Sequence, residues 1–212
     1  MTERKMTKRE ARAREVTAPD LAGTLEFLRT TERLKTTYRS GFTSDGQRES
    51  VAEHTWRICM MAVVLAPHFP DVDFSRLVKI CIVHDLGEIV GGDIPATEQA
   101  RRRAENPAAT KSEDERRDLL TLIAPLPPDS AREIVALWDE YEAALTPEAK
   151  LAKALDKLET ILQHTQGENP PDFDYRFNLG YGREYTAGHL VIVALRAAID
   201  ADTALRSRSS TG

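Results

Sequence analysis

Cysteine is scarce in this chain of 212 residues. The two that occur, Cys59 and Cys81, each lie inside an apolar run. A free cysteine in such a setting packs as a small hydrophobic residue. The sequence has no Cys-x-x-Cys spacing, so it lacks the cysteine patterns that hold structural zinc or carry out disulfide exchange.

Long hydrophobic runs and a strong charge bias are also missing. The longest apolar run, residues 58–66, is too short for a bilayer, which takes roughly 20 residues. The charged N-terminus is not followed by the apolar segment of a secretory signal. The formal net charge of −5 gives no general attraction to nucleic acid. We therefore expect a soluble, cytoplasmic protein that binds neither membranes nor nucleic-acid polymers.

The sequence shows no convincing strand alternation and no internal repeat, whereas helical periodicity is widespread. We predict an all-α fold with one helical-bundle domain at residues 19–203. A basic, disordered segment at 1–18 and a mobile tail at 204–212 are expected to flank it. The predicted helices cover residues 19–35, 51–66, 73 or 75 to 91, 131–145, 147–163 and 183–201. The predicted loops and turns cover residues 36–50, 91–99 and 166–182.

An adjacent histidine and aspartate, His84 and Asp85, lie in one of the apolar stretches. Their neighbours are large hydrophobic residues, and burying polar groups among these costs free energy unless they are paired. A divalent metal ion would compensate for both, because neutral imidazole and ionised carboxylate are good ligands for borderline cations. A structural hydrogen bond at a helix end is the alternative.

Two other apolar helices carry matching polar residues. His54 stands near the start of the helix at 51–66, where Ser50 and Glu53 form a capping-box pattern. Asp156 lies beside the leucine stripe of the helix at 147–163, a position that more often marks a solvated edge. Together the set supplies two imidazoles and two carboxylates, which leave two positions of an octahedral ion open for water and substrate. We therefore predict a metal site between the core helices, with the ligands His54, His84, Asp85 and Asp156.

The order His…His-Asp…Asp resembles the HD-domain superfamily of metal-dependent phosphohydrolases. The segments RLKTTYRSGF, ESVAEHTWR and HDLGEIVGGDIPA are most similar to the branch that contains bacterial 5′-deoxynucleotidases and the eukaryotic HD domain-containing protein 2. The similarity runs from about residue 20 to about residue 200. An HD pair alone is a weak motif, whereas HDxxE followed by GDIP, with a matching upstream His and downstream Asp, is specific.

The resemblance implies roles for three further residues. Glu88 matches the catalytic glutamate of the branch, and an unbroken helix would place it one turn from the HD pair. Asp93 matches the aspartate that supports placement of nucleophile and substrate. Arg39 matches a substrate-contacting arginine, and a planar guanidinium is well suited to phosphate. An exposed helix residue, a turn residue and a surface arginine are the respective alternatives.

The histidine content and the residue at position 40 bear on the number of metal ions and on the sugar preference that the HD-domain resemblance implies. No histidine lies between Asp85 and Asp156, the interval from which dinuclear HD enzymes bring extra imidazoles, so we expect one divalent ion per chain. The ligand types suit Mn, Co, Fe, Ni or Zn about equally. Some bacterial deoxynucleotidases carry a Trp against the sugar where this chain has Ser40, which leaves the sugar preference open. The remaining histidines are predicted to be core or surface residues: His68, His164 and His189.

These features predict a metal-dependent phosphomonoesterase that hydrolyses (deoxy)ribonucleoside 5′-monophosphates to nucleoside and phosphate. The alternatives are an HD phosphohydrolase acting on another nucleotide or a phosphorylated biosynthetic intermediate, and a non-catalytic nucleotide-binding scaffold. The presence of all four ligands together with Glu88 argues against the scaffold, since a pure binding module has no need of that glutamate. We also expect a homodimer with a complete site in each subunit. The helix at 51–66 is apolar on more than one face, and the helix with Trp138 and Tyr141 adds aromatic surface.

Overall fold

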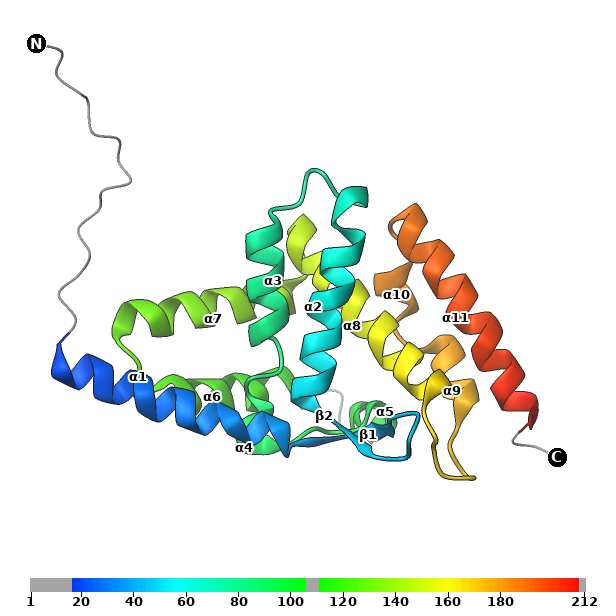
Figure 1. Ribbon diagram of the computed structural model, residues 1–212, viewed down its shortest axis with the longest axis horizontal. Helices are drawn as coiled ribbons and strands as arrows, with labels where there is room; N and C mark the ends of the chain where they lie inside the picture. The colour runs from blue at the N-terminus through cyan, green and yellow to red at the C-terminus, as the bar shows by residue number, and fades with distance from the viewer. Residues whose placement is uncertain (1–16, 106–110, 210–212) are drawn as a thin grey trace, which may run out of the picture.

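Helices make up most of the computed structural model, which describes residues 17–105 and 111–209 (Figure 1). The predicted all-α class is confirmed. Among the described residues, no helix has the length and apolar character needed to cross a membrane. The first half contains α1 (Ala18–Thr31), η1 (Glu32–Lys35), β1 (Tyr38–Phe42), β2 (Arg48–Ser50), α2 (Val51–Leu65), η2 (Ala66–His68), α3 (Phe74–Val83), α4 (Glu88–Gly91) and α5 (Ala96–Glu105). The second half contains α6 (Lys111–Ile123), α7 (Pro128–Ala143), α8 (Pro147–Gln166), α9 (Tyr175–Gly180), α10 (Arg183–Thr186) and α11 (Leu190–Ser209).

Side-chain caps fix the starts of the helices that matter most for the site. Ser50 and Glu53 form the predicted capping box of α2: the Glu53 amide donates to Ser50 Oγ at 3.2 Å, and the Ser50 amide donates to Glu53 Oε2 at 2.7 Å. Thr146 caps α8 as predicted, through a 3.2 Å bond from the Ala149 amide. Each such cap contributes about 1 kcal/mol to stability.

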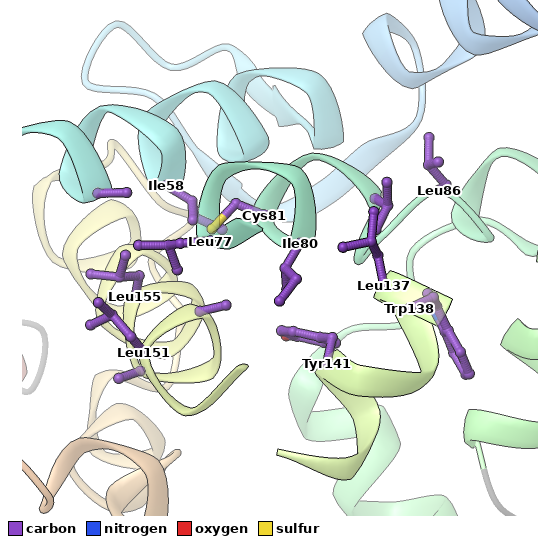
Figure 2. Packing of buried hydrophobic residues seen from close by; sticks show 14 of the residues in the cluster. Ile58, Leu77, Ile80, Cys81, Leu86, Leu137, Trp138, Tyr141, Leu151 and Leu155 are labelled. Atoms are coloured by element: carbon purple, nitrogen blue, oxygen red, sulfur yellow. The ribbon is translucent and has the colours of Figure 1, made fainter. Parts of the chain in front are cut away.

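Helix α8 crosses the centre of the molecule and packs against α2, α3, α7, α9, α10, α11 and β1 (Figure 1). Its predicted leucine stripe is buried at Leu151, Leu155 and Leu158. Figure 2 shows Leu151 and Leu155 among side chains of α2 and α3, with Tyr141 of α7 below Ile80. Because neighbouring elements surround α8 on several sides, several of its polar residues are buried as well, including Asp156 and Glu159.

The prediction of a loop at residues 36–50 is wrong, because these residues form an antiparallel hairpin. Strands β1 and β2 pair Tyr38 with Ser50 and Phe42 with Arg48. The turn between them has Gly46 at φ +81°, a conformation that glycine adopts at little cost. Both strands are too short to show a clear two-residue period.

The prediction of one helix through the HD pair is also wrong. Helix α3 ends at Val83, and four turn residues precede α4. Two backbone bonds of three-residue spacing cross this turn: the Leu86 amide donates to Val83 O at 3.2 Å, and the Glu88 amide donates to Asp85 O at 3.1 Å. A Cβ on Gly87 would lie 2.8 Å from Glu115 O, so the glycine allows α6 to approach closely.

Other boundaries differ in smaller ways. The segments predicted as turn and loop at 91–99 and 166–182 include the start of α5 and all of α9. The predicted final helix is divided at residues 187–189 into α10 and α11, and α11 includes residues 204–209 of the predicted tail. Residues 1–16 and 210–212 lie outside the described residues. Trp138 and Tyr141 are only 2% and 5% exposed, so the expectation that they add aromatic surface is wrong.

Candidate metal centre

The structure brings the four predicted ligands together. His54 on α2 is fully buried, and its Nε2 lies 3.4 Å from Asp156 Oδ1 and 3.7 Å from Asp85 Oδ2. His84, directly after α3, is also buried, with its Nε2 3.1 Å from the same Asp85 oxygen. The side chains of His54, His84 and Asp85 offer ligand atoms that all lie within 4.8 Å of one another.

Both imidazoles present Nε2 to the carboxylates. His84 Nδ1 lies 2.7 Å from Cys81 O, and a carbonyl can only accept, so Nδ1 carries the hydrogen. His54 Nδ1 bonds to a carboxylate oxygen of Glu159. Neither Nε2 atom has a hydrogen-bond partner in the described part of the chain, although both are buried. Two imidazole lone pairs directed at two carboxylates fit a divalent cation.

The two carboxylates stay ionised despite their burial. Burial alone would raise the pKa of Asp85, but His84 and His54 hold it below its usual value. Burial likewise opposes ionisation of Asp156, yet Lys157 and His54 hold its pKa well below the usual range. The site therefore offers negatively charged oxygen ligands at neutral pH, as a metal ion requires.

Asp156 is held by two partners that the sequence reasoning missed. Tyr141 Oη donates to Asp156 Oδ2 at 2.6 Å, and Lys157 Nζ lies 2.9 Å from the same oxygen. These contacts leave Oδ1 facing His54. Lys157 follows Asp156 directly and was visible in the sequence, whereas the contribution of Tyr141 depends on how α7 packs against α8.

Glu159 and Arg57 form a second layer behind His54. Glu159 is fully buried, and its Oε1 accepts from Arg57 Nε at 2.6 Å. Burial opposes its charge, but His54 and Arg57 lower the pKa of Glu159 to about 2. In turn, burial opposes protonation of His54, whereas Glu159 and Asp156 raise its pKa to about 10 in the absence of a metal ion. A bound cation would take the place of the Nε2 proton. The spacing was a usable signal, because Glu159 follows Asp156 by three residues and Arg57 follows His54 by three.

Arg39, on β1, points at the site rather than at solvent. Its side chain is 12% exposed, and its guanidinium reaches Glu49 Oε2 at 3.4 Å, Asp85 Oδ2 at 3.5 Å and Thr160 Oγ1 at 2.9 Å. Burial opposes its charge, but Asp85 and Asp93 are the leading groups that raise the pKa of Arg39, so it stays cationic. The surface alternative is therefore wrong for this arginine.

The other predicted residues lie at different depths. Glu88 is buried at the start of α4, and its amide bonds to Asp85 O at 3.1 Å. Asp93 is half-buried and close enough to Arg39 for its charge to act on the guanidinium. His164 is buried against Asn178, while the other two histidines are exposed: His68 and His189. The catalytic roles of Glu88 and Asp93 stay predictions.

Comparison with known proteins gives consistent results. Residues 31–193 match the HD domain. The bovine 5′-deoxynucleotidase HDDC2 (Bos taurus) is 33% identical over 183 residues, which is 84% of this chain and 84% of the relative. The human 5′-deoxynucleotidase HDDC2 (Homo sapiens) is 35% identical over 147 residues, or 68% of each chain.

Solved structures show the same relationship. A predicted metal-dependent phosphohydrolase from Magnetospirillum magnetotacticum MS-1 superimposes with a TM-score of 0.75 at 32% identity, over 91% of this chain and 97% of that chain. A conserved hypothetical protein from Pyrococcus furiosus gives a TM-score of 0.57 at 27% identity, over 84% of this chain and 98% of that one. The matched segment contains all four predicted ligands, and this chain belongs to the HD-domain family.

Proposed function

We propose that this protein is a metal-dependent phosphomonoesterase that hydrolyses (deoxy)ribonucleoside 5′-monophosphates to nucleoside and inorganic phosphate. The observation that carries the proposal is the pair of buried histidine Nε2 atoms facing ionised Asp85 and Asp156, with the Arg39 guanidinium alongside. The relatives named 5′-deoxynucleotidases support the substrate class.

One divalent ion would be held by His54, His84, Asp85 and Asp156. When bound, it would supply Lewis acidity for the activation of water and for neutralising charge on the phosphoryl group. The ligand types suit Mn, Co, Fe, Ni or Zn. One ion is favoured over two because the interval between Asp85 and Asp156 has no histidine.

The remaining residues position the substrate and move protons. Arg39 binds the phosphate, since a guanidinium can grip two phosphate oxygens and this one stays charged beside the ligands. Asp93, near Arg39, helps to place substrate and nucleophile. Glu88, next to the HD pair, transfers a proton during hydrolysis, a contribution of typically ~10²–10⁴-fold in rate.

Phosphate release from a panel of nucleotides tests the proposal. The chelated protein, with and without added Mn²⁺, is given nucleoside 5′-monophosphates, 3′-monophosphates and 5′-triphosphates. We expect metal-dependent release from the 5′-monophosphates, with deoxyribose and ribose compared directly. Release from triphosphates alone would indicate a different HD phosphohydrolase, and nucleotide binding without turnover would indicate a scaffold.

We further propose a homodimer that uses the exposed side of α2. Trp56, Met60, Val63 and Val64 are 63%, 43%, 52% and 65% exposed, and their spacing places them on one helix face. A two-fold axis through such a face would pair it with itself. Light scattering should give twice the mass of a single chain for the wild-type protein. In the Trp56→Glu variant the measured mass should fall toward that of a single chain. A single-chain mass for the wild-type protein at micromolar concentration would rule out the dimer.

A cytoplasmic location stays a prediction.

A further inference from the structure

His54 and His84 differ in the group that hydrogen-bonds to Nδ1 of the ring. His84 Nδ1 bonds to a neutral backbone carbonyl, whereas His54 Nδ1 bonds to the carboxylate of Glu159 on α8. We propose that Glu159 is a positioning residue, which fixes the His54 tautomer so that Nε2 is the metal-binding atom. This inference rests on the ligand set of the proposed function.

Both carboxylate oxygens of Glu159 are engaged inside the protein. Oε2 meets His54 Nδ1, and Oε1 accepts from Arg57 Nε at 2.6 Å. An ionised carboxylate has no hydrogen to donate, so the hydrogen of this bond belongs to Nδ1. The Nε2 atom, on the opposite side of the ring, faces Asp156 Oδ1 at 3.4 Å and is then the nitrogen whose lone pair would bind the metal ion. A hydrogen-bonded anion behind an imidazole also makes it a more basic ligand.

A second group of ligating side chains offers a competing arrangement. Glu49, His54 and Glu159 also have ligand atoms within 4.8 Å of one another. A cation at that position would need Nδ1 without its hydrogen. It would also lie beside Arg39, which contacts Glu49 at 3.4 Å, and Arg57, which contacts Glu159 at 2.6 Å. The guanidinium groups already supply the positive charge there, so the ion belongs on the Nε2 side.

The position of Glu159 on α8 explains how one helix provides both a proposed metal ligand and the carboxylate behind His54. It follows Asp156 by three residues, so the two carboxylates share a helix face, one directed at Nε2 of His54 and one at Nδ1. Gln163, one turn further, accepts from Arg57 and donates to Phe42 O at 2.5 Å. The carboxylate is therefore held by Arg57, which Gln163 in turn links to the β1–β2 hairpin.

The tautomer can be read directly in the wild-type protein loaded with Zn²⁺ alone. Long-range ¹H–¹⁵N spectra of protein labelled with ¹⁵N-histidine distinguish a protonated from a metal-bound ring nitrogen. We expect His54 with Nδ1 protonated and Nε2 bound to zinc. Zinc on Nδ1 of His54 would overturn the proposal, and this measurement does not depend on any variant folding.

Zinc affinity of variants provides the second readout. Glu159→Gln keeps the shape and one acceptor oxygen but removes the charge, and loss of such an outer partner typically weakens metal binding 10–100-fold. The control is Glu133→Gln, which removes an exposed carboxylate paired with Lys79 at 2.6 Å and should leave zinc affinity unchanged. Asp85→Ala should abolish zinc binding.

The two hypotheses fail in different ways. If Asp85→Ala binds zinc as tightly as the wild type, the ligand set is wrong and the inference about Glu159 fails with it. If Asp85→Ala loses zinc but Glu159→Gln matches the Glu133→Gln control, the positioning role alone is wrong. A 10–100-fold loss in Glu159→Gln, with a native circular dichroism spectrum, supports the role.

Discussion

His164 should make the stability of this protein sensitive to acid. His164 on α8 is 7% exposed, its Nδ1 lies 3.1 Å from Asn178 Oδ1, and its ring meets that of Phe173 edge to face at 4.9 Å between centroids. Burial is the main cause that lowers its pKa from 6.5 to about 4. The folded protein therefore keeps this histidine neutral at a pH where the unfolded chain has already bound a proton.

The sign and size of the effect follow from linkage. Below pH 6.5 the unfolded state gains a proton at His164 that the folded state does not take up until pH 4, so stability falls as the pH falls. A tenfold difference in proton affinity between the two states corresponds to about 1.4 kcal/mol, which gives a full loss of about 3 kcal/mol. Between pH 7 and pH 5 the loss from this one group is about 2 kcal/mol.

Urea unfolding of the chelated protein at pH 7 and pH 5 measures the effect. His164→Gln removes the titrating group and keeps a polar side chain that can reach Asn178. Other titrating groups act in both proteins, so the difference between the two pH dependences isolates His164. We expect the wild type to lose about 2 kcal/mol more than the variant over this range. Equal losses in the two proteins would refute the reasoning.

Three further substitutions test the site. Glu88→Gln should keep the metal by elemental analysis while kcat falls ~10²–10⁴-fold; loss of the metal would make Glu88 a ligand or a structural support. Arg39→Lys keeps the positive charge but loses the planar guanidinium that can bind two phosphate oxygens. The kcat/KM for a 5′-monophosphate should therefore fall roughly 10-fold or more. An unchanged kcat/KM would exclude contact between Arg39 and the phosphate. Tyr141→Phe removes the 2.6 Å donor to Asp156, and metal affinity should fall roughly 10–100-fold; wild-type affinity would show that Lys157 alone holds the carboxylate.

Local patterns predicted the parts of the fold that local interactions determine. The capping box at Ser50, the cap at Thr146 and the leucine stripe of α8 depend on residues within one or two helical turns. The convergence of the four ligands could be predicted too, because an imidazole or a carboxylate among large apolar residues is unusual unless it is bound. The distances of 3.1–3.7 Å between their histidine nitrogens and carboxylate oxygens depend on how the helices pack, and only the family resemblance indicated that packing.

Tertiary contacts determine the features of the fold and the site that the sequence did not predict. The hairpin is joined to α8 by the bond between Gln163 and Phe42 O, which no short-range pattern indicates. The helix through the HD pair is interrupted where Gly87 lets α6 approach its backbone. Tyr141 was expected at the surface, yet the packing of α7 on α8 puts its hydroxyl on Asp156.

Phosphate release from 2′-deoxyadenosine 5′-monophosphate, followed as the chelated protein is titrated with Mn²⁺, tests the central claim most directly. With the ligands His54, His84, Asp85 and Asp156, release should rise linearly and level off at one ion per chain, and Asp85→Ala should release none at any metal concentration. No release from the wild type, or a plateau reached only at two ions per chain, would contradict a mononuclear 5′-nucleotidase.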